Sequence, residues 1–503
     1  MIVGTVIAAI ALLFPLLVAA VVWISVRTGN QGAYRIHSAG KRLLLSMSGS
    51  LDTVAYSPPT TRWRTTGNPF GRLLATAASE TPVPTREAVP PIPTPPPRLD
   101  PEPFSLASKR FEDQSTLPSS LMSAESETEA IAYLESIESL ADQDLGFRQT
   151  AVNVICDFLR LSSQRPPREA SGLIHFDQHD RGGRSDSVSA AAFGQRILEH
   201  HLSPRAQSYW GRVDLCLDGA HLADLRLETA VLGKVSFVGT RFIGSTSFAG
   251  ATFEEPAFFD RAWFKSTANF TGIRFQTTSQ FGGARFDGDV RFDGARFEGH
   301  ANFNDAEFTG ARFDGARFGA AAEFVNGTFK GELRFDSASF LEAAAFASAQ
   351  FHGITRFDSA DFNEIAIFSS ISASDYVRFD SVAFEDRAIF RGARFEFVVR
   401  FDGARFDRDA DYSKAFFGGP VQLTHLQVVG DLNFAASQAA SSINLDASRF
   451  SGRIDFDRSV LEEPPTFGAA RVLSPIAYTG PVLNGTFEVD PAGHGWYRFV
   501  PGL

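Results

Sequence analysis

Residues 291–299 read RFDGARFEG, and the surrounding chain repeats this stretch with small changes, as in NDAEFTG and GARFDGARFG. Phenylalanine returns every five or six residues and is flanked by arginine on one side and by an acidic residue on the other. Two structures fit this alternation: a groove that stacks single-stranded nucleic acid on exposed rings, or a repetitive scaffold that buries the rings. The spacing of the rings and the charge of the chain distinguish the two.

The spacing starts with five-residue steps at leucine and then alternates between five and six residues at phenylalanine. Alanine stands two residues before most of these positions, and side chains two apart lie on one face of an extended strand. A five-residue step would turn an α-helix by about 140°, so the rings would not form one stripe on a helix. The spacing therefore predicts short strands joined by corners and stacked as a four-sided solenoid. The predicted structural core includes Leu217, Leu222, Leu227, Leu232, Phe237, Phe242, Phe248, Phe286, Phe292, Phe297, Phe303, Phe308, Phe313, Phe318, Phe335, Phe357, Phe379, Phe401 and Phe406.

Two runs of the chain, CLDGAHLADLRLETAVLGKVSF and DGARFEGHANFNDAEFTGARFDGARF, resemble the pentapeptide-repeat family, and the resemblance covers about residues 213–472. It implies a mainly β fold, the right-handed quadrilateral β-helix. This chain departs from the family's unit by placing arginine before the central residue and by alternating five- and six-residue steps. The alternation predicts about 22 residues per coil, with a bulge at two opposite corners, and about twelve coils at about 4.8 Å each form a rod of about 55–60 Å. Three successive five-residue steps, from Phe303 to Phe318, predict either a local shift of the bulged corners or one square coil.

Residues 1–26 are predicted to form a transmembrane helix, because residues 2–26 contain no charged side chain and about 20 apolar residues span a bilayer. Basic residues from Arg27 to Arg42 follow directly, so the positive-inside rule places the bulk of the chain in the cytoplasm, below a bacterial plasma membrane. Residues 27–120 are rich in proline, serine and threonine and are predicted to be a disordered linker.

Residues 121–204 show apolar residues at helical spacing, interrupted by Gly146, and are predicted to form a small helical region. The runs AIAYLESIESLADQDLGFRQTAVNVICDFLR and FGQRILEHHL resemble the helical lead-in of membrane-anchored, actinobacterial-type pentapeptide-repeat proteins. The solenoid itself is assigned to residues 205–475. Residues 476–503 are predicted to be either a cap on the last coil or a disordered tail, and aromatic residues such as Trp496 favour the cap.

No catalytic residue, cofactor or metal ligand is predicted. The acidic residues recur in phase with the repeat rather than in a separate cluster, and His175 and His179 of HFDQHD lie in a loop rich in Gly, Arg and Ser. Cys156 and Cys216 stand in apolar contexts, which predicts buried, reduced thiols. With 47 basic and 58 acidic side chains, the chain has no general attraction for nucleic acid.

These features predict a membrane-anchored scaffold that binds an unidentified protein partner and has no catalytic activity. A first alternative is a DNA mimic, because some soluble members of the family imitate duplex DNA and engage type II topoisomerases. Residues 231–470 have 24 basic and 32 acidic side chains, a net charge of −8. A second alternative is a carbohydrate-active enzyme, because other right-handed β-helices degrade polysaccharides. The open end of a coil also allows a homodimer.

Overall fold

The computed structural model describes most of the C-terminal four fifths of the chain, namely residues 127–164, 189–473, 478–480, 485–489 and 496–501. All of these residues belong to one compact unit. None of the helices within the described ranges is long and apolar enough to cross a membrane. The apolar stretch 2–26, the linker 27–120 and the HFDQHD loop lie outside the described residues.

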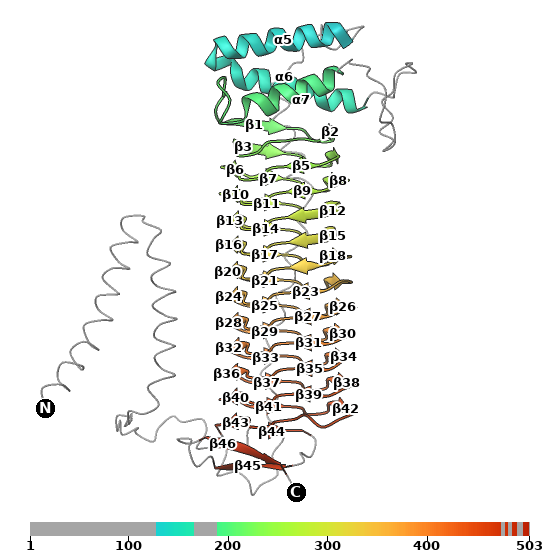
Figure 1. Cartoon of the computed structure of the whole chain (residues 1–503), viewed down its shortest axis with the longest axis vertical. Helices are drawn as coiled ribbons and strands as arrows, with labels where there is room; N and C mark the ends of the chain where they lie inside the picture. The colour runs from blue at the N-terminus through green and yellow to red at the C-terminus, as the bar shows by residue number, and fades with distance from the viewer. Residues whose placement is uncertain (1–126, 165–188, 474–477, 481–484, 490–495, 502–503) are drawn as a thin grey trace, which may run out of the picture. The chain divides into compact units, whose positions relative to one another are not determined.

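In the part of the chain that the structure describes, three α-helices precede the solenoid (Figure 1). α5 (Glu127–Gln143) and α6 (Arg148–Gln164) are connected by the short 3-10 helix η2 (Leu145–Phe147), and α7 (Ala190–His201) follows. Apolar residues at helical spacing pack into one core with the first coils, because a single stripe of each helix is apolar. The helix residues buried there include Leu134, Ile137, Ile155, Leu159, Ile197 and Leu198.

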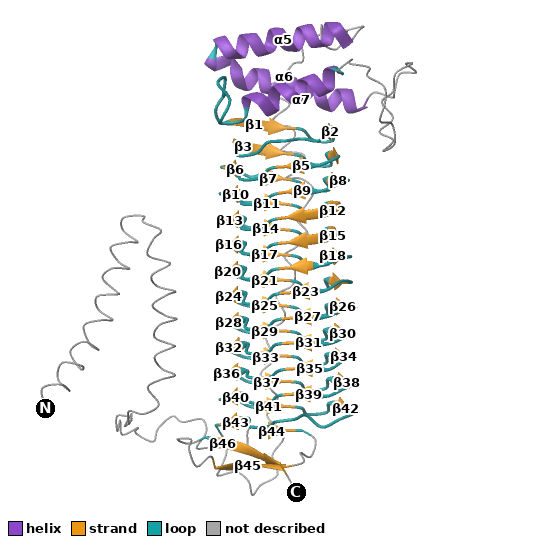
Figure 2. Ribbon diagram, viewed as in Figure 1, coloured by secondary structure: helices purple, strands orange, loops and turns teal. Residues whose placement is uncertain are grey.

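After the helices, short parallel strands are stacked as a four-sided solenoid of about 12 turns (Figures 1 and 2). Side 1 carries the inward residue Phe237 and its equivalents, side 2 carries Phe242, side 3 carries Phe248 and side 4 carries Phe253. Sides 1 and 4 are joined in one hydrogen-bonded sheet and sides 2 and 3 in another.

In the first sheet, β3 (Val231–Ser236) runs through the corner from side 4 to side 1, and β1 (Val213–Cys216), which pairs with β3 on both sides of this corner, passes through it as well. Side 1 consists further of β1 (Val213–Cys216), β7 (Ala257–Phe258), β11 (Ser279–Gln280), β14 (Ala301–Asn302), β17 (Ala322–Glu323), β21 (Ala344–Ala345), β25 (Ala366–Ile367), β29 (Ala388–Ile389), β33 (Ala410–Asp411), β37 (Leu432–Asn433), β41 (Ile454–Asp455) and β44 (Tyr478–Thr479). Side 4 consists further of β6 (Thr252–Phe253), β10 (Arg274–Phe275), β13 (Arg296–Phe297), β16 (Arg317–Phe318), β20 (Ser339–Phe340), β24 (Asp361–Phe362), β28 (Ala383–Phe384), β32 (Arg405–Phe406), β36 (Gln427–Val428), β40 (Arg449–Phe450) and β43 (Arg471–Val472).

The second sheet contains two strands, β12 (Arg285–Arg291) and β15 (Glu307–Arg312), that run through the corner from side 2 to side 3. Side 2 consists further of β2 (His221–Ala223), β4 (Arg241–Ile243), β8 (Trp263–Phe264), β18 (Thr328–Phe329), β22 (Gln350–Phe351), β26 (Ser372–Ala373), β30 (Arg394–Phe395), β34 (Phe416–Phe417), β38 (Gln438–Ala439) and β42 (Val460–Leu461). Side 3 consists further of β5 (Thr246–Ser247), β9 (Ala268–Asn269), β19 (Leu333–Arg334), β23 (Thr355–Arg356), β27 (Val377–Arg378), β31 (Val399–Arg400), β35 (Val421–Gln422) and β39 (Ile443–Asn444).

On sides 1 and 3 the inward rings form long stacks along the solenoid axis, whereas Ala373 interrupts the stack on side 2. On side 1 the ring centroids of Phe324 and Phe346 are 4.8 Å apart with planes within 1° of parallel. On the opposite side 3, Phe335 and Phe357 stack at 5.0 Å, and Phe335 meets Phe346 edge to face at 5.6 Å. Every residue named above as structural core is at most 2% exposed. Stacked rings inside each side and edge-to-face rings between sides therefore fill the interior.

Coil length is set by the residues at the corners. Most coils have 22 residues, as between Phe275 and Phe297, whereas the first coil is square, with 20 residues between Leu222 and Phe242. The irregularity expected at 303–318 is present, but it is neither a shift of the bulged corners nor a square coil. That coil has 21 residues, because the corner between sides 2 and 3 in β15 is one residue shorter than in β12.

Most five-residue corners are tight turns with one residue in the left-handed region. In RFDGARFEG, the N–H of Ala295 donates to the carbonyl of Phe292 at 2.9 Å, and Gly294 between them has a φ of 63°. Glycine adopts this conformation without the steric cost of a Cβ atom. The same position also holds other residues, such as Ser337 and Ala447, each with a φ of 58°.

Two glutamine side chains close the N-terminal end of the stack. Gln149 of α6 donates to the carbonyl of Asp214 at 2.9 Å and accepts from its N–H at 2.9 Å. Gln195 of α7 pairs with Ala223 in the same way, at 2.6 and 3.1 Å. These two side-chain amides give hydrogen-bond partners to the edge of the first coil, which would otherwise be unpaired.

A buried histidine joins the helices to the chain that enters the solenoid. Nε2 of His201 is 2.8 Å from a carboxylate oxygen of Glu138, and Nδ1 is 2.7 Å from the carbonyl of Ser208. The imidazole also stacks on Trp210 with the centroids 4.1 Å apart. This cluster links α5, α7 and the segment before β1 into one cap.

The C-terminal segment covers the last coil. β45 (Gly485–Val489) and β46 (Tyr497–Pro501) form an antiparallel hairpin, and β46 also pairs antiparallel with β43. Phe467 at the end of the side 3 stack contacts both strands of the hairpin, with its ring centroid 5.5 Å from Phe487 and 5.9 Å from Phe499. The antiparallel hairpin ends the parallel stacking at this end of the solenoid.

The two cysteines are free and buried. Cys156 lies in α6 and Cys216 in β1, and burial raises the pKa of the Cys216 thiol to about 11. A thiol with such a pKa stays protonated near neutral pH, so it is a weak nucleophile.

We expect Tyr412→Phe to raise the free energy of unfolding by about 1–3 kcal/mol. Tyr412 stacks between Phe390 and Phe434 at 4.7 and 4.9 Å, its hydroxyl is buried without a hydrogen-bond partner, and burial raises its pKa well above the usual value. Urea unfolding of the two proteins measures the gain. Tyr376→Phe is the matched control, because the Tyr376 hydroxyl has a partner, and equal effects of the two substitutions would contradict the argument.

Candidate interaction surface

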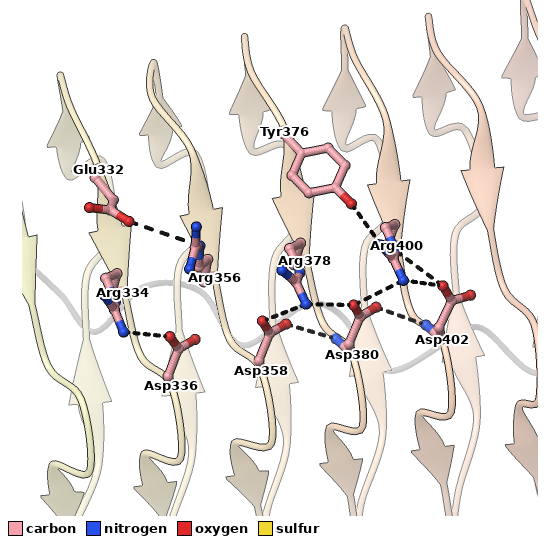
Figure 3. Close-up of polar contacts among 10 residues, drawn as sticks. All are labelled: Glu332, Arg334, Asp336, Arg356, Asp358, Tyr376, Arg378, Asp380, Arg400 and Asp402. Atoms are coloured by element: carbon pink, nitrogen blue, oxygen red, sulfur yellow. Dashed lines mark hydrogen bonds and ion pairs between the residues drawn. The ribbon is translucent and has the colours of Figure 1, made fainter.

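Side 3 carries two charged columns on its outer surface. In six successive coils the residue before the inward phenylalanine is arginine and the residue after it is aspartate. Parallel stacking in register places each residue beside its equivalents in the next coils (Figure 3). The arginine column is Arg291, Arg312, Arg334, Arg356, Arg378 and Arg400, and the aspartate column is Asp293, Asp314, Asp336, Asp358, Asp380 and Asp402.

Arginines of this ladder bridge the aspartates of two coils. Arg378 is 3.0 Å from Asp358 in the preceding coil and 2.9 Å from Asp380 in its own coil. Arg400 is 3.3 Å from Asp380 and 2.6 Å from Asp402. Because these groups are partly exposed, each ion pair contributes at most about 1 kcal/mol to stability.

The aspartates also bind the backbone of the following coil. A carboxylate oxygen of Asp358 accepts from the N–H of Asp380 at 3.2 Å, and a carboxylate oxygen of Asp380 accepts from the N–H of Asp402 at 3.1 Å. Burial raises the pKa of Asp358, and the guanidinium of Arg378 partly offsets that rise. The aspartate column is thus occupied by contacts within the solenoid, which makes it a structural feature.

Two arginines depart from the ladder, because among the described residues neither Arg312 nor Arg356 forms an ion pair with an aspartate. The ion pair that Arg356 makes is with Glu332, at 3.9 Å from Nε. Figure 3 shows its side chain directed toward Glu332, away from the aspartate column. The guanidinium of Arg356 therefore has donors that the neighbouring coils do not use.

An apolar strip lies beside this arginine, at the corner between sides 2 and 3. Ile354, Tyr376 and Val398 occupy equivalent positions in three successive coils, and Phe397 precedes Val398. Phe397 is 58% exposed and Ile354 is 38% exposed, and the Tyr376 hydroxyl accepts a hydrogen bond from Arg400 at 3.2 Å. We call Ile354, Tyr376, Phe397 and Val398 the corner strip.

The sequence of the solenoid matches one known protein family. A family model described as pentapeptide repeats, in nine copies, matches residues 237–282, 281–328 and 379–427. This chain is a pentapeptide-repeat protein. No curated protein and no solved structure matches it.

The unmatched interval 329–378 of this pentapeptide-repeat protein contains Ile354, Arg356 and Tyr376. Its strands nevertheless keep the same stacking, as in β19, β23 and β27.

The repeat pattern predicts that its phenylalanines form the core, and it gives no sign of the corner strip. Phe397 falls two residues after the inward Phe395, outside the five- and six-residue steps. The corresponding corner position holds small or polar residues in other coils, namely Gly331, Gly353, Asp375 and Gly419. A large apolar side chain at a corner that is otherwise small or polar is the signal that would have identified the strip.

A second aromatic residue on the outer surface, Trp263, is already in contact with neighbouring charged side chains. Trp263 of β8 pairs in register with Arg241 and Arg285 on its two sides, and their guanidinium carbons lie 4.8 and 5.3 Å from the indole ring. Its Nε1 donates to Asp287 at 2.7 Å. Cation–π contacts and this hydrogen bond occupy the ring, so the cluster offers less free apolar surface than the corner strip.

Within the described ranges, no group of three or more His, Cys, Asp and Glu side chains is arranged to hold a metal ion. The His175 and His179 loop lies outside those ranges.

Proposed function

We propose that this pentapeptide-repeat protein is a non-catalytic scaffold that holds a protein partner against the outer surface of its solenoid. The observation that carries the proposal is the corner strip, where Phe397 is 58% and Ile354 is 38% exposed on the outer surface of the solenoid. Exposed apolar clusters on otherwise polar surfaces are typical of interaction sites. Helices and a hairpin cover the two ends of the stack, which favours a partner on a side of the solenoid over a homodimer through an end.

The N-terminal stretch 2–26 supports a further part of the proposal, that the scaffold is anchored in a bacterial plasma membrane with the solenoid in the cytoplasm. The stretch has no charged residue and is followed by basic residues. Anchoring would restrict the partner to the membrane surface.

The charge arrangement on side 3 weighs against the DNA-mimic alternative. A mimic of duplex DNA needs a continuous negative surface, whereas the aspartates of side 3 alternate with in-register arginines that pair with them. It weighs equally against an enzyme, because a general acid or base needs a carboxylate that is free to exchange protons and these carboxylates bind arginine and backbone N–H groups.

Proximity labelling tests the proposal. A labelling enzyme fused after residue 503 of the full chain should mark a small, reproducible set of cytoplasmic proteins in the protein's own cells. The same enzyme fused to segment 1–126 alone is the matched control. An identical set in both cases would contradict the scaffold function, and labelling of extracytoplasmic proteins alone would contradict the proposed topology.

A further inference from the structure

We propose that the corner strip and Arg356 together bind a short, extended segment of a partner protein, in which an aromatic or branched apolar side chain stands next to a carboxylate. This inference rests on the proposed scaffold function and names the site and the chemistry of the partner. Two independent features of the surface carry it, one apolar and one cationic.

The apolar feature is the exposure of side chains that the fold does not need at these positions. Equivalents of Ile354 in other coils include the polar Glu332 and Ser442, so the stacking itself does not require an apolar residue there. Phe397 is exposed by more than half. An aromatic ring on a rigid corner loses little conformational entropy on binding, which is typical of the residues that dominate interface energies.

The cationic feature is the unused hydrogen-bonding capacity of Arg356. Arg356 follows Ile354 by two residues, so both side chains project from the same side of the strand. Its neighbour Arg378 is bound to two aspartates, while Arg356 reaches only Glu332 at 3.9 Å. A guanidinium offers parallel donors that fit a carboxylate in two hydrogen bonds. A carboxylate of a partner therefore complements Arg356.

The size of the site favours a short segment over a second copy of this chain. The strip extends over three coils, which at about 4.8 Å per coil is about 10 Å along the axis. A stable interface between folded proteins buries about 800 Å² on each partner, and a strip of this length is too small for that. A nucleic acid would place a row of phosphates against Asp358 and Asp380 as well, whereas a peptide with one carboxylate needs to meet only Arg356, so the peptide is the better fit.

A display selection tests the inference. A random library of 12-residue peptides is selected on the purified full chain and depleted on the Phe397→Ser full chain, and the most enriched peptide is synthesised with a fluorophore. We expect enriched peptides with an aromatic or branched residue adjacent to Asp or Glu. Fluorescence anisotropy should show binding weakened at least tenfold by Phe397→Ser and by Arg356→Gln.

The matched controls are Val429→Ser and Arg453→Gln, because Val429 is 55% exposed and the Arg453 side chain is 74% exposed, both outside the strip. These variants should bind the peptide as the unaltered chain does, and all four should unfold at the same urea concentration.

Three results would overturn the inference: no selective enrichment, enriched peptides that lack acidic residues, or binding that Arg356→Gln leaves unchanged. A dimer in sedimentation that Phe397→Ser dissociates would overturn it too, because the strip would then bind a second copy. If labelled partners persist with the Phe397→Ser chain, the inference fails while the scaffold function stands. If the unaltered chain labels no specific partner, the scaffold function itself fails.

Discussion

Phe346→Ala is expected to lower the free energy of unfolding by about 3–5 kcal/mol, the range for removal of a fully buried aromatic side chain. Phe346 stacks between Phe324 and Phe368 at 4.8 and 4.9 Å and meets Phe335 and Phe357 edge to face at 5.6 and 5.3 Å. Its removal therefore interrupts one stack and leaves a cavity against another. Urea unfolding followed by circular dichroism measures the loss.

Phe397→Ala is the control for that substitution, because it removes the same ring from a corner where it is 58% exposed. We expect a change below about 1 kcal/mol, as for most surface substitutions. A similar loss at both positions would contradict the assignment of Phe346 to the core and Phe397 to the binding surface.

Asp260→Asn is expected to stabilise the protein by up to about 3 kcal/mol at pH 7.5 and to have little effect near pH 4. Asp260 follows the inward Phe259 on side 1 and is 7% exposed. One carboxylate oxygen has no hydrogen-bond partner, and burial raises the pKa of the carboxyl to about 6. The ionised Asp260 carboxylate therefore lowers the free energy of unfolding, and the neutral asparagine side chain removes this effect.

The sign of the pH dependence follows from that pKa. Because the folded state holds the proton more tightly than the unfolded state, stability falls as pH rises from about 4 to about 6 and is then constant with respect to this group. Stability curves across this range, for the unaltered chain and for Asp260→Asn, should converge at the acidic end. Asp305→Asn, at an exposed position of side 1, is the control. A gain from Asp260→Asn that is equal at both pH values would contradict the argument.

The architecture could be predicted because one physical requirement recurs at every side of every coil. An inward phenylalanine must return after five or six residues, and that spacing is visible in the sequence without knowledge of any contact. The irregularity at 303–318 was visible for the same reason. The form of the irregularity was not visible, because any corner of the coil could be one residue shorter. The pairing of β12 with β15 shows that the shorter corner is the one between sides 2 and 3.

The ends and the binding surface could not be predicted in the same way. Gln149 and Gln195 cap the first coil through hydrogen bonds between residues far apart in the sequence, and no local pattern marks them. Arg356 has the same neighbours in the repeat as Arg378, an inward phenylalanine and an aspartate. It differs only because Glu332 replaces an aspartate as its partner. Such a choice between two acidic partners depends on side-chain packing, which the repeat pattern does not encode.

The most direct test of the account is proximity labelling with two variants of the full chain, Phe397→Ser and Val429→Ser. Both remove an exposed apolar side chain from the solenoid, but only Phe397 belongs to the corner strip. The account predicts that the partner labelled by the unaltered chain is retained with Val429→Ser and lost with Phe397→Ser, at equal amounts of folded protein. Retention of that partner with Phe397→Ser would contradict the claim that this pentapeptide-repeat protein binds its partner at the corner strip.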